Sequence, residues 1–309
     1  MTFQNKKPLV SIGIPTYNRA KFLKIAIDSA LSQDYKNIEI LVSDNNSSDE
    51  TESLCLNYLK FHKNIKYCRS NINKGPIENF KNALKCSVGE YFMWLADDDF
   101  LDKNYISTCL NRLMENRNLV IVGGISRTFG SSKEGIGRYF NLEQQKPLCR
   151  ILAYYWNPID NSIYYGLMLS KHAKLSSIHN VLGSDWIFVA AMAYQGSLIT
   201  LKETAINRRA GGASSSLKNI VKSLGISNLN IIFPGISLAI NCAADVYCRN
   251  PIYKELTIFK RLIYTASIFI LIVLRHGLYQ TFRKAIYHFL IFIVGDRRYN
   301  LYKKYLKNK

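Results

Sequence analysis

Three adjacent carboxylates, Asp97, Asp98 and Asp99, follow directly after the apolar run at residues 91–96. Such a run is typical of a buried strand, which carries its charged residues where the strand emerges. Adjacent carboxylates repel one another, and the repulsion grows as water is excluded. A divalent cation removes that repulsion, and Mg²⁺ and Mn²⁺ prefer oxygen ligands. Taken alone, the cluster supports a metal site and a solvated acidic turn about equally.

The acidic cluster follows the last of four apolar runs in the N-terminal third of the chain. The runs at 9–14, 38–43 and 91–96 predict buried strands, and residues 65–69 predict a short strand between the last two. Segments with helical periodicity separate these strands. Strands that alternate with helices at short intervals are typical of an α/β fold with a mostly parallel sheet flanked by helices.

Polar residues stand at the ends of three of these runs, at positions 15–18, 44–46 and 97–99. The carboxyl ends of parallel strands meet at one edge of a sheet, and ligands bind at that edge. We therefore expect the three clusters to converge, which favours one binding site over three unrelated turns.

Four ordered motifs carry a resemblance to a known family. They read V-S-I-G-I-P-T-Y-N-R, I-E-I-L-V-S-D-N-N-S-S-D-E-T, N-I-N-K-G-P-I-E-N and Y-F-M-W-L-A-D-D-D. In order, spacing and strand placement they resemble the N-terminal half of a family 2 glycosyltransferase. The resemblance implies the GT-A (Rossmann-like) fold, binding of a nucleotide sugar by its α/β sheet, and inversion of configuration at the anomeric carbon.

The resemblance also implies roles for individual residues at the sheet edge. Thr16 and Tyr17 would line the nucleotide pocket, and Asp44 would accept a hydrogen bond from the base. Gly75 and Asn79 would flank the nucleoside. Taken singly, Asp44 also fits a helix cap and Gly75 an ordinary turn. The residues expected to bind the nucleotide sugar are Pro15, Thr16, Tyr17, Asn18, Asp44, Gly75, Asn79, Asp97, Arg208 and Arg209.

The acidic cluster departs slightly from the family pattern. Many relatives carry D-x-D-D after the apolar strand, and alignment on Leu95 places the first of those acids at Ala96. The resemblance then implies that Asp98 holds Mg²⁺ or Mn²⁺ against the donor diphosphate, with Asp97 nearer the ribose. Asp99 could substitute in either role, so Asp98 and Asp99 are the predicted metal ligands.

Beyond the acidic cluster the pattern predicts a second set of elements, which would form the acceptor half (about 101–215) of a catalytic domain at 1–215. The nucleotide-sugar half would be about 1–100. The further elements are a strand at 119–124, a mobile surface loop at 126–137, a helix at 147–156, a strand at 163–170, a linker at 171–180, a helix through 187–194 and a strand at 198–201.

Asp185 opens the predicted helix at 187–194. Family 2 enzymes usually carry an acidic pair there, whose Asp takes the proton from the acceptor hydroxyl. Here Ser184 replaces the first acid, and the resemblance places Asp185 as the general base. A helix N-terminus favours the ionised carboxylate that a base requires. The alternative is that Ser-Asp is an ordinary helix cap.

Two arginines and two glycines follow the predicted strand at 198–201. Arg208 and Arg209 next to Gly211 and Gly212 predict a hinge with cationic donors that could close over a diphosphate. A plain basic turn at a domain boundary explains the same residues equally well.

The composition indicates the charge of the expected partner and the compartment of the protein. Lys and Arg number 41 against 22 acidic residues, a formal charge of +19, which implies an anionic partner. We expect no nucleic acid partner, because zinc spacing and an aromatic RNA-binding motif are both missing. The 7 cysteines form no C-x-x-C pair and are odd in number, which predicts reduced thiols in a cytoplasm-like compartment. The N-terminus does not follow the signal-peptide pattern.

The segment 216–309 is a basic, apolar tail that predicts helices. Residues 262–274 are apolar on every face and lie between basic residues, but at about 20 Å they are too short for the ~30 Å hydrocarbon core. A second run at 286–294 precedes more basic residues. These features predict association with an anionic membrane surface, either peripheral or monotopic. The alternative is a helical subdomain packed on the catalytic domain.

Together these features predict an inverting, metal-dependent glycosyltransferase. It would move a sugar from a nucleotide diphosphate sugar to a hydroxyl of a glycan acceptor, expected to be lipid-linked. Its place would be the cytoplasmic face of the inner (plasma) membrane, in the synthesis of surface polysaccharide such as lipopolysaccharide O-antigen or capsule. One alternative is a nucleotidyltransferase, although residues 15–18 are not the Gly-rich loop that such an enzyme uses. The other is a decayed, membrane-bound glycosyltransferase-like protein without activity.

Overall fold

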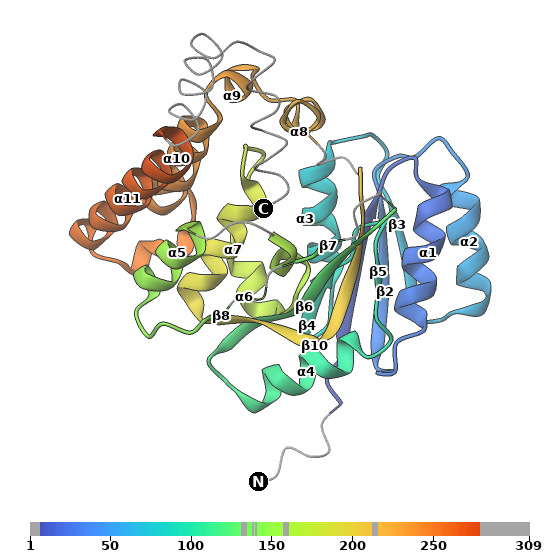
Figure 1. Cartoon of the computed structure of the whole chain (residues 1–309). Coiled ribbons are helices and arrows are strands. Elements are labelled where there is room, and N and C mark those ends of the chain that lie inside the picture. Colours follow the sequence, from blue (N-terminus) through green and yellow to red (C-terminus); the bar gives the residue numbers. More distant parts are fainter. Residues whose placement is uncertain are drawn as a thin grey trace, which may run out of the picture.

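The computed structural model describes residues 7–130, 135–137, 139, 141–156, 161–211 and 216–278. Strands and helices alternate along its N-terminal third, as predicted (Figure 1). These elements are β1 (Val10–Thr16), α1 (Ala20–Leu31), β2 (Ile38–Asp44), α2 (Thr51–Phe61), β3 (Ile65–Arg69), α3 (Pro76–Cys86) and β4 (Tyr91–Trp94).

The strands form one mixed sheet in the order β3-β2-β1-β4-β9-β6-β10-β5. The first four strands in this order are parallel to one another, as are β6 (Leu119–Phe129) and β10 (Ser197–Arg209). The short strands β9 (Leu167–Leu169) and β5 (Phe100–Leu101) run antiparallel to their neighbours, and β7 (Gly135–Ile136) and β8 (Asn141–Leu142) pair at the margins. The predicted α/β fold with a mostly parallel sheet is confirmed.

Helices cover both faces of this sheet (Figure 1). Alternate residues of β4 belong to different cores, because successive side chains of a strand point to opposite faces. Phe92 and Trp94 pack in a cluster with α3, α5 (Pro147–Trp156) and α7 (Ser184–Gln195). Met93 packs in a second cluster with α1, α2 and α4 (Tyr105–Glu115). Burial on both faces explains why the strand reads as a continuous apolar run.

Two predictions in the acceptor half are wrong for one shared reason. Residues 126–129 belong to β6 instead of a mobile loop, and Arg208 and Arg209 belong to β10 instead of a hinge. The parallel pairing of the two strands continues to their ends, where Arg208 lies opposite Thr128 and Arg209 opposite Phe129. The predicted Gly212 of the hinge lies outside the described residues.

The strand predicted at 163–170 is also mostly wrong. The 3₁₀ helix η1 (Asn161–Tyr165) occupies its first part, and only β9 is extended. The predicted linker begins with α6 (Ser170–Leu175). Ile163 and Tyr164 are buried in the cluster that includes α7, so packing between helix and sheet, rather than strand pairing, decides their conformation. A short apolar run does not distinguish these outcomes.

The described part of the tail is helical and packs partly on the catalytic domain. Ile268 and Ile272 of α11 are fully buried in the cluster that includes α5 and α7. In the described part of the chain, we find no helix with the length and apolar character of a membrane span. The apolar run predicted at 286–294 lies outside the described residues. The tail elements are α8 (Leu217–Leu224), α9 (Leu229–Ile232), α10 (Pro234–Ala244), η2 (Asp245–Arg249), η3 (Pro251–Glu255), α11 (Ile258–Ile272) and η4 (Val273–Leu278).

Candidate functional site

A cavity of about 230 Å³ opens at the carboxyl ends of β1 and β4. All three carboxylates of the acidic cluster line it, together with the carboxyl end of β10 and the loop after β1. The structure therefore brings together residues that are far apart in the chain. The lining residues are Pro15, Arg19, Phe80, Ala96, Asp97, Asp98, Asp99, Tyr165, Arg208 and Arg209.

Asp97 and Asp98 share a cation from the loop after β1. Nη1 of Arg19 lies 2.8 Å from Oδ1 of Asp97 and 2.9 Å from Oδ2 of Asp98. The hydroxyl of Thr16 donates a 2.8 Å hydrogen bond to Oδ2 of Asp97. Burial raises the pKa of Asp97 to about 6, although Arg19 and Thr16 oppose the shift. Desolvation thus outweighs the ion pair, and the negative charge is only partly compensated.

Asp99 is held from the other side of the cavity by β10. The backbone N–H of Arg209 donates to its Oδ1 at 2.9 Å, and Nε of Arg208 lies 3.9 Å from Oδ2. Burial raises the pKa of Asp99 to about 7, against the effect of the Arg209 N–H, and the charge of Asp98 adds to the rise. Burial and the neighbouring negative charge both disfavour the ionised form of Asp99, and a bound cation would offset both effects.

The predicted nucleotide-binding residues on β2 and α3 are engaged with other parts of the chain. Asp44 is fully buried, and its Oδ1 accepts hydrogen bonds from Ser47 N and Oγ at 2.9 and 2.6 Å. The hydroxyl of Tyr67 donates to its Oδ2 at 2.6 Å. Asn79 Nδ2 donates to the carbonyl of Thr16 at 3.0 Å. The side chain of Asp44 thus joins the loop after β2 to β3, and that of Asn79 joins α3 to the end of β1. Contact of Asp44 with a base stays a prediction.

The remaining predicted residues, Tyr17, Asn18 and Gly75, do not line this cavity. Tyr17 is 44% exposed, and Asn18 has a left-handed backbone with φ 53°. The side-chain oxygen of Asn18 accepts a 2.7 Å hydrogen bond from the N–H of Ser48, which ties the loop after β1 to the loop after β2. Gly75 precedes α3 with φ 83°, a conformation that favours glycine. Their predicted contact with the nucleotide stays untested.

A second cavity, of about 270 Å³, adjoins the first, because Phe80, Tyr165 and Arg208 line both. Asp185 faces it from the start of α7. The other lining residues are mostly apolar or aromatic and come from α3, η1, α8, and the start of α7 with the loop before it. They are Pro76, Ile77, Asn161, Tyr164, Val181, Gly183, Ser184, Ile220, Ser223 and Leu224.

The position of Asp185 follows from the N-terminus of α7. Gly183, the residue before the helix, has φ 81°, and a Cβ there would lie 2.2 Å from Cδ1 of Leu238. Oδ2 of Asp185 accepts a 2.8 Å hydrogen bond from Nδ2 of Asn161. Burial raises the pKa of Asp185, opposed by Asn161 and the backbone N–H of Trp186. A carboxylate with a raised pKa is a stronger base than an exposed one.

Sequence reasoning missed three residues that line the first cavity. Arg19 belongs to the P-T-Y-N-R motif, and its position among polar residues at a strand end is the only signal for it. Phe80 follows the helical period of α3 and is indistinguishable from a core residue in the sequence. Tyr165 ends η1, a region where a strand was expected.

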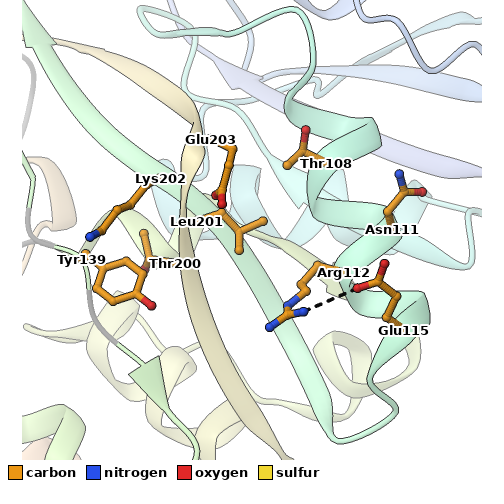
Figure 2. Close-up of a pocket in the computed structure, with 9 residues that line it drawn as sticks. All are labelled: Thr108, Asn111, Arg112, Glu115, Tyr139, Thr200, Leu201, Lys202 and Glu203. Carbon is orange, nitrogen blue, oxygen red and sulfur yellow. Dashed lines mark hydrogen bonds and ion pairs between the residues drawn. The ribbon is translucent and has the colours of Figure 1, made fainter.

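The largest of the described cavities, about 550 Å³, contains none of the predicted site residues (Figure 2). It lies between α4 and the middle of β10, at the end of the sheet away from α8 (Figure 1). Its charged side chains include Arg112 and Glu115, which form an ion pair at 3.5 Å. The two adjoining cavities, which gather the acidic cluster and Asp185, are therefore the candidate site.

Residues 11–175, more than half of the chain, match the family model described as glycosyl transferase family 2. The chain belongs to this family. Among curated relatives of this family 2 chain is a Campylobacter jejuni GalNAc(5)-diNAcBac-PP-undecaprenol beta-1,3-glucosyltransferase, 40% identical over 132 residues, which are 41% of this chain and 40% of that protein. An uncharacterized glycosyltransferase of Haemophilus influenzae is 26% identical over 219 residues, 68% of each chain.

The chain matches less than half of the length of most of these relatives. A glycosyltransferase of Rickettsia bellii is 44% identical over 125 residues, which are 38% of this chain but only 17% of that protein. The family of the matched region is thus shown, while the activity, substrates and partners of the whole protein are matters for proposal.

Solved structures of glycosyltransferases share the fold of this family 2 chain. Staphylococcus aureus TarS 1-349 in complex with UDP-GlcNAc aligns with a TM-score of 0.57 at 16% identity, over 84% of this chain and 71% of TarS. The mannosyltransferase PcManGT of Pyrobaculum calidifontis, in complex with GDP-Man and Mn²⁺, aligns with a TM-score of 0.54 at 16% identity, over 98% and 86%. The predicted GT-A fold is confirmed.

Proposed function

We propose that this chain transfers a sugar from a nucleotide diphosphate sugar to a hydroxyl group of a glycan acceptor, with inversion at the anomeric carbon. The observation that carries the proposal is the adjoining pair of cavities. The acidic cluster and the arginines line one of them, and Asp185 lines the other, with Arg208 and Tyr165 common to both. A donor diphosphate in the first cavity would present its sugar to an acceptor in the second.

The acidic cluster fits a divalent cation. Its donors are carboxylate oxygens, and burial, together with the charge of Asp98, raises the pKa of Asp99 because both disfavour its ionised form. The described residues include no group of three acidic, His or Cys side chains placed to hold a metal by themselves. Asp98 and Asp99 would therefore hold Mg²⁺ or Mn²⁺ together with diphosphate oxygens, as is usual for Mg²⁺. The ion would offset charge on the leaving diphosphate.

The arginines around the first cavity bind and orient the diphosphate. Arg208 and Arg209 approach from β10, and Arg19 approaches from the loop after β1. Guanidinium groups match the oxygens of phosphate groups geometrically and are always charged. Held by the strand rather than by a hinge, Arg208 and Arg209 are placed in advance to stabilise the charge that develops as the sugar departs.

Asp185 removes the proton from the acceptor hydroxyl as the hydroxyl oxygen attacks the anomeric carbon. Attack from the face opposite the leaving diphosphate, in a single displacement, inverts the configuration. The raised pKa of Asp185 brings its basicity closer to that of a general base at neutral pH.

The tail supports a lipid-linked acceptor at an anionic membrane, as in the assembly of O-antigen or capsule on the cytoplasmic face of the inner membrane. Phe259 of α11 is 70% exposed, and further apolar side chains of α9, α10 and α11 are exposed. Lys222 of α8 and Lys260 of α11 are exposed cations of the same segment. Apolar and cationic side chains together suit an anionic interface. Ile220 and Leu224 of α8 connect this region to the second cavity. The name of the Campylobacter relative includes an undecaprenol-linked substrate.

A panel of nucleotide sugars tests the proposal. UDP, GDP and dTDP sugars are added with Mg²⁺ or Mn²⁺, or with EDTA, and thermal stabilisation and slow sugar release are measured. We expect at least one donor to raise the melting temperature by several degrees only with metal, because ligands that bind the folded state stabilise it. A decayed site would give neither stabilisation nor sugar release with any donor.

A further inference from the structure

Two hydrogen bonds connect Asp185 to the interior of the protein. Nδ2 of Asn161 donates to Oδ2 of Asp185 at 2.8 Å, and Oδ1 of Asn161 accepts from the hydroxyl of Tyr154 at 2.6 Å. Tyr154 is buried on α5, in the cluster that includes α7. The chain of bonds runs from a fixed core side chain to a carboxylate that lines a cavity.

The direction of these bonds is determined by charge. An ionised Asp185 is only an acceptor, so the amide nitrogen of Asn161 must face it. The amide oxygen then faces Tyr154, which must donate. Burial raises the pKa of the Tyr154 hydroxyl well above its usual value, so the hydroxyl keeps the proton that it donates. Reversing the amide would place two oxygens against each other.

We infer that Asn161 is the positioning residue for Asp185, with Tyr154 as its anchor. This inference rests on the proposed function, in which Asp185 is the general base. By holding Oδ2, the Asn161 amide fixes the orientation of the carboxylate without touching the acceptor's reacting atoms itself.

Few of the described groups near Asp185 change their own charge near neutral pH. Among the residues that the structure describes and that interact with it electrostatically, Arg208 on β10 is charged at neutral pH, and the tyrosines and the cysteine have raised pKa values. The groups from the surrounding elements are Tyr154 on α5, Tyr164 and Tyr165 on η1, Arg208 on β10 and Cys242 on α10. Asp97 and Asp99 in the adjoining cavity, whose pKa values burial raises to about 6 and about 7, also titrate in this range, so the effect of Asn161 is read from the difference between the pH profiles of each variant and the wild type.

The test is the pH profile of transfer by Asn161→Ala, Asn161→Asp and Tyr154→Phe. We expect Asn161→Ala to lower kcat about 10- to 100-fold, part of what a general base contributes. The donor KM stays within about twofold, because no donor contact changes. The pKa read from the acidic limb of the pH profile rises in Asn161→Ala, because a hydrogen bond that favours the ionised form of Asp185 is lost. It rises further in Asn161→Asp, where a like charge is added. Tyr154→Phe has the same effects, but smaller.

Tyr155→Phe is the matched control, because Tyr155 is the neighbouring buried tyrosine of α5 and its hydroxyl contacts Cys242. We expect its pH profile to be that of the wild type. If Asn161→Ala or the nearly isosteric Asn161→Asp melts like the wild type and keeps its kcat and pH profile, Asn161 has no positioning role. If Asp185→Asn itself keeps transfer, the proposed role of Asp185 as general base fails instead, and if the wild type transfers no sugar the proposed function fails, which makes these failures distinguishable.

Discussion

The two cavities hold their carboxylates in different ways. In the first cavity, which we call the donor cavity after its proposed ligand, Asp97 has Thr16 and Arg19 as partners, and Asp99 has the backbone of Arg209. In the second, which we call the acceptor cavity, one side chain, Asn161, donates to Asp185, and most of the other lining residues are apolar or aromatic. The first cavity is organised by charge and the second by shape.

Under the proposed function, this difference matches what each cavity would recognise. Every nucleotide diphosphate sugar carries the same diphosphate, so its charges can be met by side chains that are already in place. Acceptor glycans differ in ring substituents and linkage, and aromatic walls contact sugar rings without fixed charge. Substitutions in the first cavity should therefore affect donor binding, and substitutions in the second should affect turnover.

The largest expected effect is in the donor cavity. Asp98→Asn keeps the shape of the side chain but removes the charge that would hold the metal. We expect transfer to fall about 1,000-fold and metal-dependent binding of nucleotide diphosphate to be lost, as measured by kinetics and calorimetry.

Asp102→Asn is the control for this substitution, because Asp102 pairs with Arg127 at 2.9 Å and lines neither cavity of the site. Metal-dependent binding of the diphosphate that survives in Asp98→Asn would show that the donor cavity is not organised around this carboxylate.

A smaller effect is expected from α11 of the tail, whose substituted residues line neither cavity. Replacing the exposed Phe259 and Ile263 of α11 with serine should weaken binding to vesicles of anionic lipid about tenfold, since two apolar side chains are lost from the interface. Transfer to a soluble acceptor should not change. Phe61→Ser, on the 75% exposed Phe61 of α2, is the control. Equal loss of vesicle binding in that control would argue against the tail as the membrane surface.

The smallest effect concerns stability. Burial raises the pKa of Asp99 to about 7, so the folded protein binds this proton more tightly than the unfolded chain does. The resulting stabilisation is complete below the ordinary carboxyl pKa of about 4 and is lost as the pH rises through about 7. In EDTA at pH 8, Asp99→Asn should raise the free energy of unfolding by on the order of 1 kcal/mol. Urea unfolding that shows a less stable variant at pH 8 would contradict this account of the cavity.

The N-terminal third could be predicted well, because β1, β2 and β4 are buried on both faces and read as apolar runs ended by polar residues. The end of β10 could not. A register shift between Leu201 and Ala205 carries Lys202 and Glu203 through the strand, and these charged residues hide its continuation to Arg208. The role of Asn161 is invisible for another reason, since its partners Tyr154 and Asp185 lie on separate helices that only the fold brings together.

In the proposed mechanism, donor binding and proton removal belong to different cavities. Asp185→Asn tests it most directly, with donor affinity measured by calorimetry and transfer measured on the same preparation. The proposed mechanism predicts that transfer falls by at least about 100-fold, in line with the loss of a general base, while the donor dissociation constant stays within about twofold. Transfer near the wild-type rate, or loss of donor binding in parallel with transfer, would contradict it.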